Sequence, residues 1–152
     1  MSILALDQAL VNTGIIVMDL TGKLLHHETF KVNKLRGVDR VLEITSRIKA
    51  MVTEFEPQIA YLEGVYGARF HVPEKGYLYY RIVELLQELR VPSLAIPPKK
   101  IKKFVTGNGN ADKDMMRKYA NKRWPITKNF DEHQIDAYGL AMLGLEAERE
   151  AA

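Results

Sequence analysis

SILALDQALVNTG, residues 2–14, carries the strongest structural signal in the chain. Its apolar run from Ile3 to Leu6 predicts a short buried strand, and the polar Asn12-Thr13-Gly14 predicts a bend into a second apolar run. A single acid, Asp7, ends the first run. A buried carboxylate needs a partner, which here is either a bound metal ion or the backbone of a turn that it caps.

The composition is that of one folded domain with an uneven charge distribution. A chain of 152 residues suits a single domain, residues 1–152, with a substantial core. The absence of cysteine excludes internal disulfides and thiolate zinc sites. The net charge is +3, but residues 98–123 carry nine Lys or Arg against two Asp, an excess of +7 that leaves −4 for the remainder. This excess indicates a polyanion partner such as nucleic acid, with a solvated helix face as the alternative.

Apolar runs are short throughout the chain. None approaches the roughly 18 residues that a bilayer span needs, and the first residues do not resemble a secretory signal. We therefore expect no membrane partner and a cytoplasmic location.

The hydrophobic periodicity predicts an α/β fold. Short turns make the first three strands antiparallel, whereas strands that follow a helix lie parallel to an earlier one. On the helices we expect Arg40 to face solvent and Tyr77 and Tyr80 to face inward. The result is a mixed five-stranded sheet flanked by helices: three strands within 2–32, helix 36–55, strand 58–63, helix 76–90, strand 91–96, two short helices within 99–123 and a last helix, 131–150.

Acids recur at the ends of predicted elements. Glu63 ends the strand 58–63 just as Asp7 ends the first strand. On the last helix, His133 and Asp136 are three residues apart and project on one face. The helix dipole explains acids in the first turn, but Asp136 lies further in, among small residues. Carboxylate and imidazole ligands around an open site suit Mg²⁺, which indicates a metal-dependent nuclease.

Basic and aromatic side chains occur in two segments. In the first, Thr106–Asn110, a Gly-x-Gly turn lies between lysines and before a helix start, which favours phosphate binding. In the second, the loop 65–76, Tyr66 and Arg69 suit base stacking and phosphate contact, unless the aromatics simply anchor the loop on the core. The residues that we expect to contact nucleic acid are Tyr66, Arg69, Lys99, Lys100, Lys102, Lys103, Lys113 and Arg117.

Four segments, in this order, resemble the RuvC family of Holliday junction resolvases within the ribonuclease H-like superfamily. The Lys…Thr-Gly-x-Gly-x-Ala-x-Lys pattern in the third segment is the most specific of them. The match spans nearly the whole chain and implies a ribonuclease H-like fold and an endonuclease. The segments are ILALDQALVNTG (3–14), YLEGVYGA (61–68), PPKKIKKFVTGNGNADK (97–113) and HQIDAYGLAM (133–142).

The resemblance implies a metal site with two Mg²⁺ or Mn²⁺ ions. The residues that it implies as metal ligands and catalytic groups are Asp7, Glu63, His133 and Asp136. His133 stands where many family members have Asp, which favours Mn²⁺ more than an oxygen ligand does. Glu132 is the alternative ligand at that place.

The resemblance also implies how the protein contacts DNA. Tyr66, three residues after the second acid, matches an aromatic that stacks at the junction crossover. Lys102 and Lys113 match lysines that contact the cleaved strand, and Lys113 also acts in catalysis. A homodimer would place two such sites on a four-way junction and nick two opposing strands symmetrically.

Other functions remain open from the sequence. One is a different enzyme on the same fold, either a YqgF-like nuclease acting on RNA or half of an actin-like sugar kinase or ATPase. The basic Thr-Gly-x-Gly segment disfavours the first, and the length disfavours the second. A junction binder without activity would not need the acids. A debranching nuclease for Y-forks and flaps differs only in the shape of its DNA.

Overall fold

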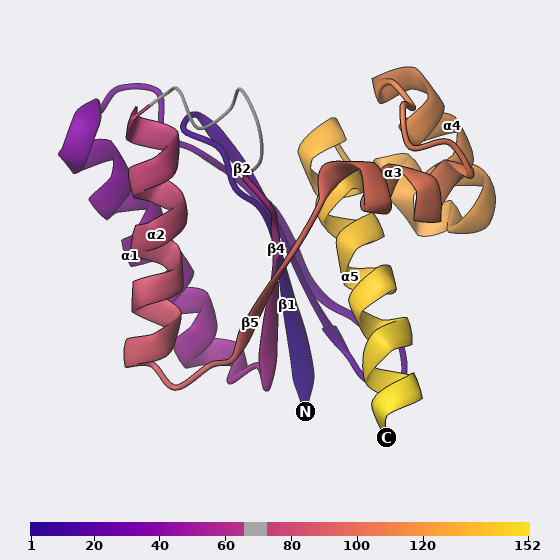
Figure 1. The fold of residues 1–152 in the computed structure, drawn as a ribbon, viewed down its shortest axis with the longest axis horizontal. Coiled ribbons are helices and arrows are strands. Elements are labelled where there is room, and N and C mark those ends of the chain that lie inside the picture. The colour runs from indigo at the N-terminus through magenta and orange to yellow at the C-terminus, as the bar shows by residue number, and fades with distance from the viewer. Residues whose placement is uncertain (66–72) are drawn as a thin grey trace.

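The computed structural model describes residues 1–65 and 73–152 and shows a five-stranded sheet between two layers of helices (Figure 1). The predictions for Tyr66 and Arg69 lie outside the described residues. The strands are β1 (Ser2–Asp7), β2 (Asn12–Asp19), β3 (Leu24–Lys31), β4 (Ile59–Glu63) and β5 (Ser93–Ile96). The helices are α1 (Gly37–Phe55), α2 (Pro73–Glu88), α3 (Pro98–Thr106), α4 (Lys113–Arg123), the 3₁₀ helix η2 (Pro125–Asn129) and α5 (Glu132–Ala151).

The sheet has the strand order β3-β2-β1-β4-β5. β1 and β2 pair antiparallel, as do β2 and β3, whereas β4 lies parallel to both β1 and β5. The predicted mixed sheet with three antiparallel strands is therefore confirmed. β1 is its central strand, and Ser2 through Leu6 are all buried.

Alternate residues of the central strands face opposite helix layers. Ile3 and Ala5 pack toward α5, whereas Leu4 and Leu6 join the core under α1 and α2. In Figure 1, α1 and α2 cover one side of the sheet, and α3, α4 and α5 lie on the other. Since side chains alternate along a strand, Asp7 follows Ala5 onto the α5 side.

The bend predicted at Asn12-Thr13-Gly14 is wrong, because these residues already belong to β2. Gly14 pairs with Asp7 across the two strands. The turn lies earlier and is closed by the buried Thr13, whose hydroxyl donates to the Ala9 carbonyl at 2.8 Å and accepts from the Ala9 N–H at 3.2 Å. Gly14 serves close packing: a Cβ there would lie 2.2 Å from the His133 carbonyl oxygen.

Two helix faces also differ from their predictions. Arg40 is buried, because its guanidinium donates to the carbonyl of Leu35, in the segment before α1, at 2.8 Å. Tyr77 and Tyr80 are exposed, since α2 turns Leu78 and its neighbours at helical spacing toward the sheet instead. No helix in the described ranges is long and apolar enough to cross a bilayer.

Candidate active site

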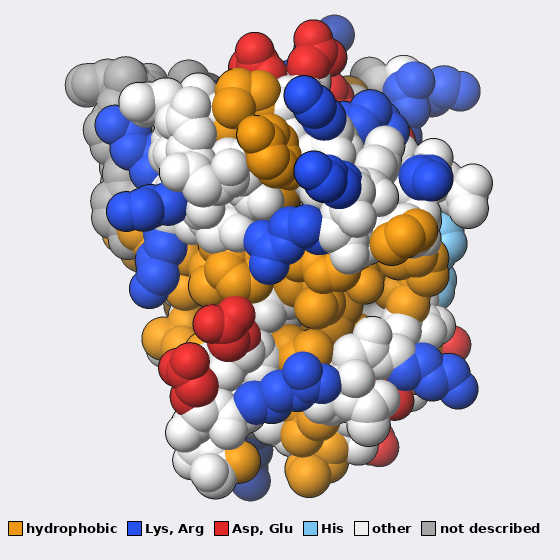
Figure 2. All heavy atoms as spheres, turned by 90° about the vertical axis from the view of Figure 1, so that its right-hand side faces the viewer, with side chains coloured by type: hydrophobic (Ala, Val, Ile, Leu, Met, Phe, Trp, Pro, Cys, Tyr) orange, Lys and Arg blue, Asp and Glu red, His pale blue; other side chains and the backbone are white. Residues whose placement is uncertain are grey.

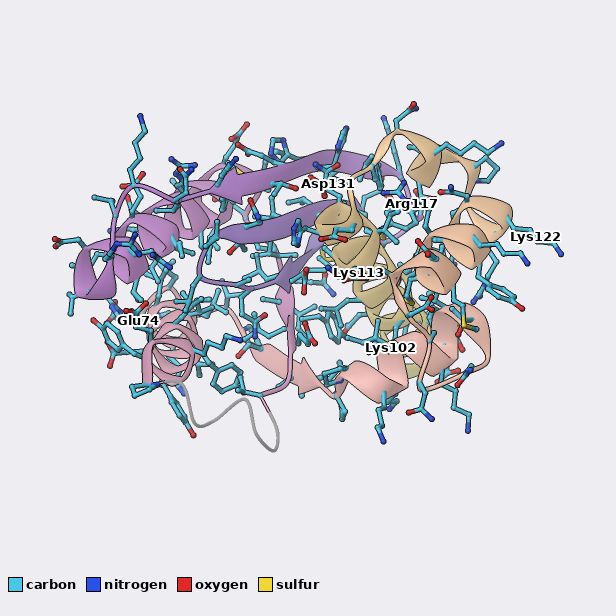
Figure 3. The ribbon with its side chains drawn as sticks, turned by 90° about the horizontal axis from the view of Figure 1, so that it is seen from above. Glu74, Lys102, Lys113, Arg117, Lys122 and Asp131 are labelled. Carbon is cyan, nitrogen blue, oxygen red and sulfur yellow. The ribbon has the colours of Figure 1, made fainter. Side chains whose placement is uncertain are left out.

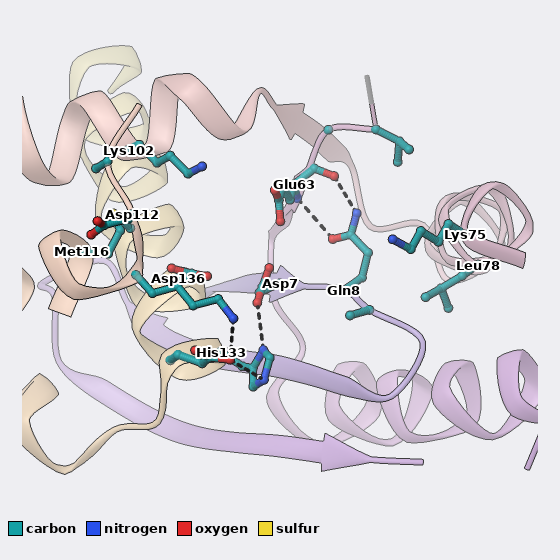
Figure 4. Close-up of a pocket in the computed structure, with 16 residues that line it drawn as sticks. Asp7, Gln8, Glu63, Lys75, Leu78, Lys102, Asp112, Met116, His133 and Asp136 are labelled. Atoms are coloured by element: carbon teal, nitrogen blue, oxygen red, sulfur yellow. Dashed lines mark hydrogen bonds and ion pairs between the residues drawn. The ribbon is translucent and has the colours of Figure 1, made fainter. Parts of the chain in front are cut away.

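A cavity of about 480 Å³ opens where β1 and β4 end, between α2 on one side and α3, α4 and α5 on the other (Figure 4). Charged side chains from six elements reach it. The cavity is lined by Asp7, Gln8, Ala9, Glu63, Gly64, Val65, Lys75, Leu78, Lys102, Ala111, Asp112, Lys113, Met116, Glu132, His133 and Asp136.

Two of the acids come from adjacent strands. β1 and β4 run parallel and in register up to Leu6 and Leu62, and the next residues are Asp7 and Glu63. Glu63 follows the buried Tyr61, which packs in the same core as Ala5, so both carboxylates lie on the α5 side of the sheet. The strand ends therefore bring together two acids that are far apart in the sequence.

The first two turns of α5 supply the remaining groups. His133 Nδ1 lies 3.6 Å from Asp7 Oδ2, and its Nε2 lies 3.5 Å from Glu132 Oε1. Asp136, one turn further along, reaches the same cavity (Figure 4). The predicted site residues Asp7, Glu63, His133 and Asp136 thus all line one cavity.

Asp136 is the acid with the clearest electrostatic perturbation. Burial and the negative charges of Glu63 and Glu132 raise its pKa from 3.8 to about 6, although His133 and Lys102 act in the opposite direction. Desolvation and like charges both disfavour the ionised form. Burial is the larger effect, and a divalent cation bound here would favour the ionised carboxylate.

The chemistry of these groups fits such an ion. Three carboxylates supply the hard oxygen ligands that Mg²⁺ and Mn²⁺ take, and one imidazole adds nitrogen. Within residues 1–65 and 73–152, no three His, Asp or Glu side chains form a ready metal-binding group, so coordination by all four requires their side chains to move. Glu132 is already engaged, because its Oε1 also lies 3.1 Å from Lys113 Nζ.

The start of α5 is fixed by several contacts with the sheet. Asp131 caps the helix, accepting the Gln134 N–H at 2.8 Å, and its other oxygen accepts the Thr29 hydroxyl at 2.6 Å. Gly14 allows the helix backbone to lie directly on β2. These contacts hold the backbone of α5 against the sheet at Asp131 and at His133.

The basic segment places its lysines at different distances from this cavity. Lys102 of α3 and Lys113 of α4 line it, and from above both lie on the inner side of the α3–α4 unit, whereas Lys122 points outward (Figure 3). Lys99, Lys100 and Lys103 are exposed on α3 but are not among the lining residues.

Other parts of the basic segment have structural roles. Arg117 donates to the Phe130 carbonyl at 3.1 Å and thereby joins α4 to the start of α5. Asp112 is the N-cap of α4 and accepts the Met115 N–H at 2.8 Å. Figure 2 shows Lys and Arg side chains spread over this face around an apolar area.

Gln8 and Lys75 are among the lining residues that were not predicted as site residues. Gln8 makes two hydrogen bonds to the backbone of Glu63, and its only sequence signal is its place next to Asp7. Lys75, from the first turn of α2, stands on the wall opposite Lys102 (Figure 4). Lys75 lines the cavity because the start of α2 forms one of its walls.

This sheet order, with acids from β1, β4 and α5 on one face, defines the class of ribonuclease H-like nucleases. Within that class the chain belongs to the RuvC family, since the family model described as crossover junction endodeoxyribonuclease RuvC matches residues 3–143. The members of this family are metal-dependent nucleases.

Individual relatives are similar over most of the chain. The RuvC of Prochlorococcus marinus (strain MIT 9211) is 32% identical over 119 residues, 75% of either chain. The RuvC of Parvibaculum lavamentivorans is 30% identical over 146 residues, which are 91% of this chain and 83% of that protein. Thermus thermophilus RuvC, solved in complex with a Holliday junction substrate, shares the fold with a TM-score of 0.80 at 21% identity, covering 100% of this chain and 98% of that one.

Proposed function

We propose that this chain is a structure-selective endodeoxyribonuclease that resolves four-way DNA junctions by paired symmetric nicks. One observation carries the proposal: Asp7, Glu63 and Asp136 reach one cavity from three elements, and Lys102 and Lys113 line the same cavity. The acids suit divalent cations, and the lysines suit the phosphates of a DNA strand. Membership of the RuvC family supports this reaction.

Asp7, Glu63, His133 and Asp136 are the proposed ligands of two Mg²⁺ or Mn²⁺ ions. Such ions, when bound, supply a hydroxide nucleophile at neutral pH and stabilise the charge that develops on the phosphate oxygens. A chain of contacts runs from Lys113 through Glu132 and His133 to Asp7 and orients the imidazole toward the carboxylate of β1. Hydrolysis then breaks the bond between phosphorus and the 3′-oxygen and leaves ends that can be rejoined.

The proposed DNA contacts extend from the cavity over α3 and α4. Lys102 and Lys113 hold the strand to be cleaved, and Lys113 also compensates charge at the reacting phosphate. A homodimer would place two sites on opposite strands of the junction. We propose the bacterial cytoplasm, or that of a phage-infected cell, as its location. The complete set of proposed contacts is Tyr66, Arg69, Lys99, Lys100, Lys102, Lys103, Lys113 and Arg117.

A cleavage assay tests the proposal directly. End-labelled four-way, three-way, Y-fork and linear DNA are incubated with the protein in Mg²⁺, Mn²⁺ or EDTA. We expect symmetric nicks in the four-way junction that EDTA abolishes. Asp7→Asn should bind the junction as the parent does but not cleave it, and Asp39→Asn, the same change in the first turn of α1, should cleave normally.

Each other outcome identifies a different function. Equal cleavage of all branched substrates would indicate a general debranching nuclease. Tight junction binding without cleavage in either metal would indicate a non-catalytic binder. Cleavage by Asp7→Asn at the parental rate would refute the metal-ligand assignment.

A lysine double variant tests the DNA path. Lys102→Ala with Lys113→Ala should lower the cleavage rate. It should also make the dependence of log binding affinity on log salt concentration shallower, by the amount expected for about two lost phosphate contacts, since each neutralised phosphate releases counterions. Lys122→Ala, an exposed lysine on the outer side of α4, is the control. An unchanged salt slope in the double variant would place the DNA elsewhere.

A further inference from the structure

Gln8 connects the ends of the two strands that carry the first two acids. Its side-chain Nε2 donates to the Glu63 carbonyl at 2.5 Å, and its Oε1 accepts the Glu63 N–H at 3.2 Å (Figure 4). Both contacts go to the backbone of Glu63 and leave the carboxylate of that residue directed into the cavity.

These two bonds tie the end of β4 to the end of β1, just beyond the last paired residues of the two strands. Ala60 and Gly64 direct their N–H groups to β5, toward the carbonyls of Pro92 and Ile96. Alternate residues of a strand bond to opposite neighbours, so the N–H and C=O of Glu63 point toward β1. The pairing of β1 with β4 ends at Leu6 and Leu62, where the chain turns away into residues 8–11.

A primary amide offers one donor and one acceptor side by side, as a peptide unit does. The Gln8 side chain therefore satisfies both polar backbone groups of Glu63 in a part-buried place. Without it, the backbone of Glu63 would lose both of these contacts, and the position of its carboxylate would be less closely fixed.

We propose that Gln8 is a positioning residue that sets the separation of the Asp7 and Glu63 carboxylates and thereby the metal affinity of the site. This inference rests on the proposed function. Replacing a group that orients a metal ligand by hydrogen bonding typically changes metal affinity by about 10- to 100-fold. Gln8 itself provides no ligand, because its amide is used on the backbone.

The test measures binding of Mn²⁺ alone by isothermal titration calorimetry. Gln8→Met keeps the length of the side chain and removes both hydrogen bonds, and it should weaken Mn²⁺ binding by about 10-fold or more. Gln58→Met is the matched control: Gln58 stands just before the other end of β4 and contacts Glu148 at 3.4 Å. Its Mn²⁺ affinity should equal that of the parent.

A second readout separates positioning from general damage. In EDTA, Gln8→Met should bind a four-way junction within 2-fold of the parent, because the lysines are unchanged. Should Gln8→Met not fold, Gln8→Ala, which leaves room for water at Glu63, takes its place in the same titration.

The outcomes distinguish this inference from the proposed function. Parental Mn²⁺ affinity in the Gln8 variant, with binding lost in Asp7→Asn, overturns the role of Gln8 and leaves the metal site intact. A parent protein that binds no Mn²⁺ overturns both. Weakened binding in the Gln8 variant but not in the Gln58 variant establishes the inference.

Discussion

Asp136 is expected to destabilise the metal-free protein at neutral pH. Its pKa is raised from 3.8 to about 6 by burial and by the charge of Glu63. One pKa unit corresponds to about 1.4 kcal/mol, so the ionised form costs roughly 3 kcal/mol relative to the unfolded chain. Because the folded pKa is the higher one, this group contributes stability below pH 3.8, and the contribution is lost as pH rises through 6.

The variant Asp136→Asn removes this titration. In EDTA at pH 8, it should be more stable than the parent, whose ionised carboxylate remains buried beside like charge. Between pH 5 and pH 8 the parent should lose about 1.4 kcal/mol relative to the variant, which corresponds to about 3–6 °C in melting temperature for a domain of this size. Added Mg²⁺ should stabilise the parent at pH 8 and have little effect on the variant.

Urea unfolding at both pH values in EDTA provides the measurement. Asp114→Asn, the same chemical change at an exposed position in the first turn of α4, is the control. If the difference in unfolding free energy between parent and Asp136→Asn is the same at pH 5 and pH 8, the carboxylate does not titrate near 6, and its crowding with Glu63 is refuted.

Two further substitutions test how α5 is held on the sheet. Gly14→Ala places a Cβ 2.2 Å from the His133 carbonyl and should lower the free energy of unfolding by about 2 kcal/mol or more. Gly76→Ala, whose Cβ would meet nothing within 4 Å, should instead stabilise α2 by up to about 1 kcal/mol. Equal effects of the two substitutions in thermal unfolding would contradict the close approach of α5 to Gly14. Asp131→Ala removes the helix cap and should cost about 1 kcal/mol and slow cleavage through His133, whereas Asp131→Asn retains a cap. Equal cleavage rates in Asp131→Ala and Asp131→Asn would show that the helix cap does not affect the site.

Much of the fold follows from local sequence patterns. Runs of apolar residues predicted the strands, and the intervening helix predicted that β4 lies parallel to an earlier strand, which the structure shows to be β1. That arrangement alone implies that the acids after these runs, Asp7 and Glu63, occupy the same edge of the sheet. The side of each helix that faces the core is less well predicted by sequence. Tyr77 and Tyr80 are partly apolar, as Leu78 is, so the pattern of apolar residues does not distinguish the buried side of α2 from the exposed one.

The candidate site divides in the same way. The amino-acid sequence by itself predicted the four expected ligands, from the acids that end two strands, the spacing on the last helix and the resemblance to the RuvC family. Only the tertiary structure decided that Gln8 binds the backbone of Glu63 and that Gly14 lets α5 pack directly on β2. It also decided that Lys102 and Lys113 reach the cavity, while Arg117 donates to the Phe130 carbonyl. These features depend on contacts between residues distant in the chain, whose distances and directions arise only when strands and helices pack together.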